Sequence, residues 1–177
     1  SARFPTGTDP YDVSRTSVRD DYLETELPTS SGFYGLVPTL SFVYPTEPAV
    51  VFGNVRYTWN IERDITAKQL GGDPANPQPY GKIDAGDVIG ASLGVGLSLN
   101  DSLSVMASYD HSVVFKTSQN GSVVQGSTVL QIGTLGIGGT WRSSSRTSYN
   151  LFVGIGVTDD APDVSVGLRV PITFDLY

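Results

Sequence analysis

The sequence contains no cysteine, which excludes disulfide frameworks, thiolate metal sites and cysteine nucleophiles. Histidine occurs once, so a zinc site built from several histidines is excluded as well. Charged residues make up only 16% of the chain, less than is usual for a soluble domain. The net charge of −7 opposes an interaction with nucleic acid, because a phosphate backbone is bound through lysine and arginine.

Long apolar runs are also missing, and none reaches the roughly 18 residues of a transmembrane helix. No secretory signal peptide opens the chain. The length of 177 residues fits one domain, so we expect a single domain over residues 1–177. Because the sequence begins inside an expected strand, Ser1–Phe4, we expect that strand to be truncated and the chain to be trimmed from a longer one.

Apolar residues recur at every second position, which predicts β-strands. In the clearest segment, residues 164–176, one face is apolar and the other polar over a length that exceeds a soluble strand and suits a membrane-crossing one. The alternation slips only between Ile132 and Leu135, which predicts a bulge near Gly133. We expect about eight strands, near residues 1–4, 34–44, 51–61, 89–99, 103–110, 129–141, 149–157 and 164–176.

Two features favour a membrane barrel over a soluble β-sandwich. The polar face of the strands is rich in glycine and serine and poor in lysine and glutamate. The second feature is a set of aromatic residues toward strand ends, as in membrane-interface girdles: Tyr34, Tyr44, Tyr57, Trp59, Trp141 and Tyr149. The predicted fold is therefore all-β: an antiparallel up-and-down transmembrane β-barrel with about eight visible strands, alone or as the C-terminal part of a larger barrel.

The lengths of the connections alternate. Tight turns are expected at residues 45–48, 100–101 and 142–146, and longer links at residues 5–31, 66–87 and 117–128. Outer-membrane barrels place short turns on the periplasmic side and long loops outside. The order follows that rule, apart from a short last link at residues 158–163, and it predicts a C-terminus at the periplasmic rim.

The segment 154–174 resembles the C-terminal hairpin of a family of outer-membrane transporters grouped under the meta-pathway of phenol degradation. Phe4-Pro5-Thr6-Gly7 is similar to that family's Pro-Thr-Gly step at a strand end, and Gly86-Asp87-Val88 to its Gly-Asp-Val strand start. The resemblance spans most of the chain and implies an outer-membrane barrel with small hydrophobic compounds as cargo. A relative with a similar barrel secretes functional amyloid subunits, so the cargo does not follow from the fold.

The polar face would line the lumen of the barrel. Its charges either set the ion selectivity of a pore or form ion-paired ladders, and its glycines either leave room for a plug or cargo or, as we favour, permit strong curvature. The predicted charges are Arg56, Glu62, Asp110, Lys116, Arg169 and Asp175, and the predicted lumen glycines are Gly90, Gly94, Gly96, Gly154, Gly156 and Gly167.

Other chemistry has weaker support. His111 lies between Asp110 and Ser112, but alternation turns it to the opposite face, which argues against a hydrolase. No glycine pattern for phosphate binding is found, so nucleotide binding has no support. We expect no enzymatic activity, no metal and no cofactor. The acidic first loop offers oxygen ligands for calcium, although its spacing fits no EF-hand and a solvated loop is favoured: Asp9, Asp12, Asp20, Asp21, Glu24 and Glu26.

We therefore expect a channel or transporter in a Gram-negative cell outer membrane, for passive passage of small, in particular hydrophobic, compounds or of an exported polypeptide. The alternative is a closed eight-stranded barrel that serves as a membrane anchor or adhesin through its acidic loops. A soluble binding sandwich is a third, weaker hypothesis. The expected partners are outer-membrane lipid and the cargo, without nucleic acid, and a homo-oligomer is compatible with the sequence.

Overall fold

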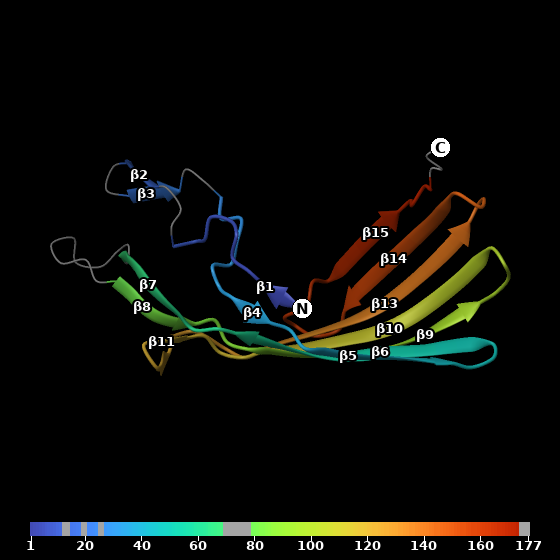
Figure 1. The fold of residues 1–177 in the computed structure, drawn as a ribbon, viewed down its shortest axis with the longest axis horizontal. Coiled ribbons are helices and arrows are strands. Elements are labelled where there is room, and N and C mark those ends of the chain that lie inside the picture. The colour runs from blue at the N-terminus through green and yellow to red at the C-terminus, as the bar shows by residue number, and fades with distance from the viewer. Residues whose placement is uncertain (12–14, 19–20, 25–26, 69–78, 174–177) are drawn as a thin grey trace. The chain divides into compact units, whose positions relative to one another are not determined.

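A computed structural model describes residues 1–11, 15–18, 21–24, 27–68 and 79–173 of the chain (Figure 1). These residues form the antiparallel strands β1 to β15, so the prediction of an all-β, antiparallel fold is confirmed. The described residues include no helix that is long and apolar enough to cross a membrane.

Contacts within the chain divide it into two compact units. Unit 1 comprises residues 1–38, 57–88 and 115–129, and unit 2 comprises residues 39–56, 89–114 and 130–177. The long links that the sequence predicted fall in unit 1. Strand β6 (Ala49–Asn60) begins in unit 2 and ends in unit 1.

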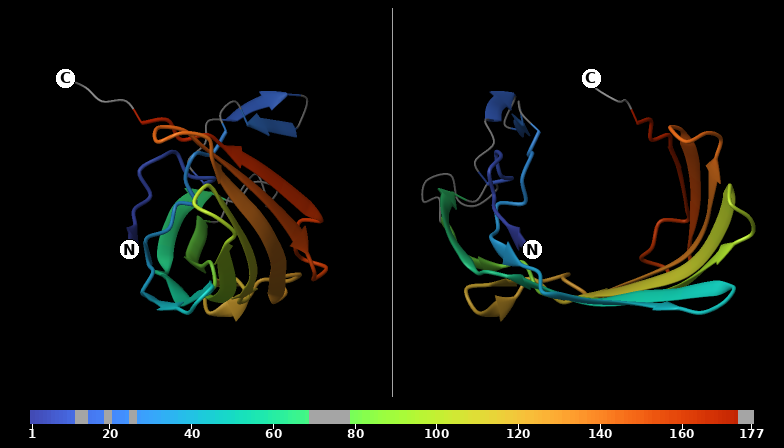
Figure 2. Two further views of the ribbon diagram at one scale, coloured as in Figure 1. Left: turned by 90° about the vertical axis from the view of Figure 1, so that its right-hand side faces the viewer. Right: turned by 45° about the vertical axis from the view of Figure 1, so that its right-hand side comes forward.

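Unit 2 is an antiparallel sheet whose strands lie side by side in chain order, β5-β6-β9-β10-β13-β14-β15 (Figure 2). Valine, leucine, isoleucine and aromatic residues at alternate positions favour these strands, because branched and ring side chains suit a pleated surface. The connectivity is the up-and-down order that the alternation predicted. The remaining bounds are β5 Thr39–Pro45, β9 Val88–Ser98, β10 Leu103–Val114, β13 Leu130–Arg142, β14 Ser148–Gly156 and β15 Val164–Arg169.

Tight turns join β5 to β6, β9 to β10 and β13 to β14 at one end of the sheet. Pairing resumes at Val50 after the first turn and at Ser148 after the third. In the second turn the Asn100 side chain accepts hydrogen bonds from the backbone N–H groups of Ser102 and Leu103, both at 2.9 Å. Such a side-chain turn explains why asparagine stands there.

Strand β13 contains no bulge, so the bulge predicted near Gly133 is wrong. Strands β10 and β13 stay in one register from the pair Leu103–Trp141 to the pair Val114–Leu130. The apolar pattern slips because Ile132 pairs with Ser112 and shares the polar side of the sheet with it.

The last strand is shorter than predicted, since β15 ends at Arg169 and does not run on to residue 176. Pro171 has no N–H group to donate to a neighbouring strand, which interrupts a ladder. Its carbonyl still accepts a hydrogen bond from the backbone N–H of Ser148 at 3.3 Å. Residues 174–177 lie outside the described residues.

The outermost strands of unit 2 are β5 and β15. Among the described residues, β5 pairs with β6 and β15 pairs with β14, and the two outer strands do not pair with each other. The described part of the chain therefore forms an open sheet, and the closed barrel that the sequence predicted is not present in it.

Unit 1 consists of short strands that the sequence analysis treated as loops, apart from β1 (Ala2–Arg3) and β4 (Gly35–Leu36), which pair with each other. Strand β4 also pairs with the end of β6 through Gly35–Asn60 and Leu36–Trp59. A hairpin of β2 (Arg15–Val18) and β3 (Asp21–Glu24) stands apart from these pairs. The second sheet has the order β12-β11-β8-β7, with bounds β7 Arg63–Lys68, β8 Pro79–Asp84, β11 Ser118–Gln119 and β12 Ser122–Val123.

A small hydrophobic core stabilises unit 1. Phe33, Ile65 and Ile83 form it, and each is at most 6% exposed. Tyr11 packs beside this core, with its ring edge-on to Phe33 at 6.2 Å and to Tyr80 at 5.2 Å. Unit 1 therefore has the interior of a folded unit rather than that of a set of loops.

The described residues of unit 2 form no comparable core. Large apolar side chains remain exposed on its strands, such as Leu40 at 77% and Val166 at 69%. Its sheet is a single layer, whereas a β-sandwich buries such residues between two. Every buried residue that the structure describes in unit 2 is a glycine: Gly53, Gly90, Gly94, Gly133, Gly136, Gly138 and Gly154.

Replacing Ile65 with alanine should destabilise unit 1 selectively, because truncating a buried isoleucine costs about 2–5 kcal/mol. We expect faster amide hydrogen exchange at residues 63–66 and 81–84, and unchanged exchange in β10 and β13. Val123→Ala is the matched control, since Val123 is 59% exposed. Equal effects of the two substitutions would contradict a core at Ile65.

Candidate functional site: the glycine face of unit 2

Pleating gives the sheet of unit 2 two chemically different faces. The apolar face carries exposed apolar and aromatic side chains, among them Leu40, Phe42, Leu93, Tyr109, Ile137, Trp141, Leu151 and Val166. The glycine face carries the residues between them, among them Phe52, Arg56, Gly90, Gly94, Met106, Asp110, Gly138, Phe152 and Gly154.

An ion pair between Arg56 and Asp110 crosses the glycine face. Strand β9 separates β6 from β10, so the Arg56 side chain reaches over β9. It does so above Gly90, where a Cβ atom would lie 2.7 Å from Arg56 Nε. Arg56 Nη1 and Nη2 donate to the two Asp110 carboxylate oxygens at 2.8 and 2.9 Å, and Nη2 also donates to Ser112 Oγ at 2.7 Å. This bidentate contact is the strong form of such a pair, and glycine at position 90 leaves the space for it.

Three bulky apolar side chains of the glycine face lie on glycines in the same way. A Cβ atom added to any of these glycines would come within 3.3 Å of the covering side chain. The covering side chains therefore lie close to the backbone of the sheet rather than standing away from it. The pairs are Phe52 on Gly94, Met106 on Gly138, and Phe152 on Gly136 and Gly154.

A pocket of about 480 Å³ opens on unit 2 beside these side chains. Its walls come from β6, β9, β10, β13 and β14, near the end of the sheet that carries the tight turns. The volume lies in the range of small-molecule sites, and none of the described lining residues is charged. The apolar wall includes Phe52, Met106 and Phe152, and the polar groups come from Ser98, Ser104, Thr140 and Asn150.

Two of the predicted lumen charges lie in unit 1, outside the strands. Glu62 lies between β6 and β7, and its carboxylate is 3.3 Å from Lys82 Nζ. Lys116 follows β10 and is exposed. Neither side chain takes part in the ion pair on the glycine face.

The remaining two predicted charges stand apart as well. Arg169 ends β15 and pairs through its backbone with Asn150, and no ion pair of its side chain is found among the described residues. Asp175 lies outside the described residues. Of the six predicted charges, the structure brings together Arg56 and Asp110.

The surroundings of the predicted lumen glycines are of three kinds. Side chains of the same sheet fill the space over Gly90, Gly94 and Gly154. Gly96 and Gly167 are open, because a Cβ atom would lie 4.0 Å from its nearest neighbours at Gly96 and would meet nothing within 4 Å at Gly167. At Gly156, by contrast, a Cβ atom would overlap the carbonyl oxygen of Pro162. The covered glycines thus accommodate neighbouring side chains of this chain.

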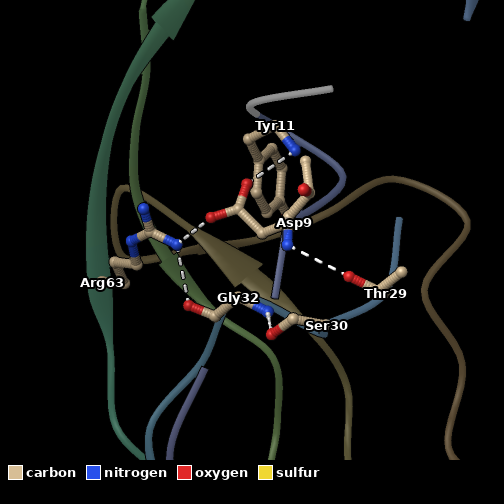
Figure 3. A network of polar contacts seen from close by, with 7 residues as sticks. Asp9, Tyr11, Thr29, Ser30, Gly32 and Arg63 are labelled. Carbon is tan, nitrogen blue, oxygen red and sulfur yellow. Dashed lines mark hydrogen bonds and ion pairs between the residues drawn. The ribbon is translucent and has the colours of Figure 1, made fainter. Parts of the chain in front are cut away.

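Unit 1 contains a second polar cluster (Figure 3). Arg63 on β7 donates from Nη1 to the Asp9 carboxylate and, at 2.8 Å, to the carbonyl of Gly32. Asp9 is 6% exposed and also accepts a hydrogen bond from the backbone N–H of Tyr11 at 2.9 Å. Burial raises the pKa of the Tyr11 phenol, and the neighbouring Tyr80 and Asp9 raise it further. The cluster ties the N-terminal segment to β7.

This cluster bears on the calcium hypothesis, because Asp9 is engaged with Arg63. No group of three or more metal-ligating side chains is found in the part of the chain that the structure describes. The side chains of the other acidic residues considered lie outside that part: Asp12, Asp20, Asp21, Glu24 and Glu26.

His111 lies on the apolar face, as the alternation predicted. Its Nδ1 is 3.0 Å from the hydroxyl of Tyr109, and the two rings stack at 6.0 Å. Asp110 and Ser112 lie on the opposite face, where both bind Arg56. The three neighbours in sequence therefore do not converge as a hydrolase site requires.

The sequence analysis assigned no role to Phe52, Met106 and Phe152. The sequence signal that could have identified these three residues is a bulky apolar side chain among the glycines and serines of a polar face. Comparison with models of known protein families finds no match. Function is therefore inferred from the residues of the apolar face and the glycine face.

The Arg56–Asp110 pair should show energetic coupling. Since the Arg56 and Asp110 side chains are 31% and 42% exposed, we expect Arg56→Gln and Asp110→Asn to couple by about 0.5–1 kcal/mol in unfolding experiments. In a Gly90→Ala background the coupling should disappear, because the added Cβ displaces the guanidinium. Arg169→Gln with Asp110→Asn is the control pair and should be additive; coupling that persists in the Gly90→Ala background would contradict the geometry.

Proposed function

We propose that the chain forms a transmembrane β-barrel in a Gram-negative outer membrane and acts there as a passive channel. The apolar face of unit 2 would contact lipid, and the glycine face would line the lumen. The distribution of burial in unit 2 carries this proposal, since its described buried residues are glycines while leucine, valine and isoleucine are exposed mainly on one face. Fully burying such a side chain is worth about 1.5–3 kcal/mol, so their exposure supports a covering apolar medium.

The aromatic residues support contact with a membrane. Trp141 and Tyr149 stack on the apolar face at 5.5 Å beside a tight turn, where an aromatic girdle of a membrane interface is expected. Tyr109 lies on the same face near the middle of β10.

Strand length and connectivity agree with the same proposal. Strands β6 and β10 have 12 residues each and β13 has 13, enough to cross a bilayer. The chain leaves unit 2 for unit 1 at the strand ends opposite the tight turns. If long connections face outward, as in known barrels, unit 1 is extracellular and the tight turns are periplasmic.

A barrel requires that the open sheet be closed. The edges of β5 and β15 would pair with each other or with further strands, because unpaired N–H and C=O groups are too costly in lipid. Transport would be diffusive, with small, in particular hydrophobic, compounds or an exported polypeptide as cargo.

A closed barrel acting as an anchor or adhesin is the second candidate. The observation that favours it is the core of unit 1, where Phe33, Ile65 and Ile83 are buried. A folded extracellular unit suits the binding of a partner better than mobile loops do.

Lipid contact can be tested with neighbouring residues on opposite faces. In a background with Trp141→Phe and Trp59→Phe, the substitutions Leu151→Trp and Phe152→Trp place one tryptophan on the apolar or the glycine face. Brominated phospholipid in vesicles should quench the first emission strongly and the second weakly. Equal quenching at the two positions would contradict the assignment of the faces.

The channel can be tested in planar bilayers with the full chain. We expect discrete conductance steps of reproducible size, and a reversal potential that shifts toward cation selectivity in Arg56→Gln, because Asp110 then keeps an uncompensated negative charge. Arg169→Gln should shift it in the same direction. Silence from folded, heat-modifiable protein would instead favour the anchor.

A further inference from the structure

The bulky apolar residues that line the pocket on the glycine face come from alternate strands. Phe52, Met106 and Phe152 come from β6, β10 and β14, and all three line the pocket of about 480 Å³. The strands between them, β9 and β13, carry the glycines against which Phe52 and Met106 lie. Each large side chain thus leans over a neighbouring strand that has no side chain at that point.

This arrangement determines how far the large side chains project from the sheet. At Gly94 the Phe52 ring occupies the space that a Cβ atom would fill, and the Ala107 carbonyl oxygen lies 3.0 Å from the same point. An alanine at position 94 would therefore push the ring away from the sheet. Gly167, on β15 and the same face, lies outside the pocket and would accept a Cβ atom without displacement, because nothing lies within 4 Å of that point.

The side chains that line the pocket differ in chemistry from those of the Arg56–Asp110 ion pair. The pocket offers hydroxyl and amide groups from Ser104, Thr140 and Asn150 but no charged side chain among the described lining residues. An apolar constriction opposes ions, which must lose hydration to pass, more than it opposes uncharged solutes.

We propose that Phe52, Met106 and Phe152 form a size-selecting constriction for uncharged solutes, and that the glycines beneath them set its width. This inference rests on the proposed function, because it places the glycine face in the lumen of a channel. The pocket is the space left between the three side chains, and its width depends on how closely they lie on β9 and β13.

The test is uptake of uncharged sugars, from a monosaccharide to a trisaccharide, by liposomes that contain the full chain. Gly94→Ala should slow uptake of the trisaccharide severalfold more than uptake of the monosaccharide, because the displaced Phe52 ring narrows the constriction. Gly167→Ala is the matched control and should behave as the wild type, because Gly167 lies on the glycine face outside the pocket. Phe52→Ala should raise the rate of trisaccharide uptake severalfold. Adding Gly94→Ala to Phe52→Ala should leave that rate unchanged.

Heat-modifiable migration on gels shows which variants fold. If Gly94→Ala does not fold, Phe52→Ala and Phe152→Ala still test the constriction, since both should relax the size limit. Sugar uptake by the wild type with an unchanged size limit in these variants would overturn this inference alone. No uptake by the folded wild type would overturn the channel and the constriction together.

Discussion

The structure of unit 2 depends on one constraint: its strands carry apolar residues on a face that no second layer covers among the described residues of that unit. The inner strands pair on both sides, which satisfies their backbone, but the side chains of Leu40, Leu93 and Val166 remain exposed. Fully burying each such side chain is worth about 1.5–3 kcal/mol, so a sheet of this kind gains little from folding in water. A covering apolar medium would stabilise the fold, and the proposed lipid-facing barrel provides one.

The glycine face answers a different requirement. Glycine in a strand interior weakens the strand, because it loses more backbone entropy and packs no side chain. In unit 2 that cost is offset locally, since Arg56 reaches Asp110 over Gly90 and the Phe52 ring packs onto Gly94. Glycine thus provides the depth into which longer side chains fit, and a single layer obtains side-chain packing without a second sheet.

The period of the apolar residues predicted which residues share a face of a strand. It could not predict contacts that depend on which strands are adjacent. Alternation placed Arg56 and Asp110 on one face and His111 on the other, but it could not show that Arg56 crosses β9, because that contact depends on which strands are adjacent. The bulge predicted near Gly133 was wrong because Ile132 was assumed to share the apolar face. The core of unit 1 was missed because Phe33 precedes β4 outside any strand, and Ile65 and Ile83 come from short strands in segments without a clear period.

The contribution of the Arg56–Asp110 pair depends on closure of the barrel. Because both side chains are partly exposed, 31% for Arg56 and 42% for Asp110, solvent and salt screen the attraction, and its contribution to stability stays small. Inside a narrow lumen fewer water molecules would surround the pair, and the attraction would grow, while removal of one partner would leave the other poorly solvated. The same two residues can therefore act as a weak surface contact in the open sheet and as a determinant of ion selectivity in the closed one. This dependence is why charge-neutralising variants are more informative in a membrane than in detergent-free solution.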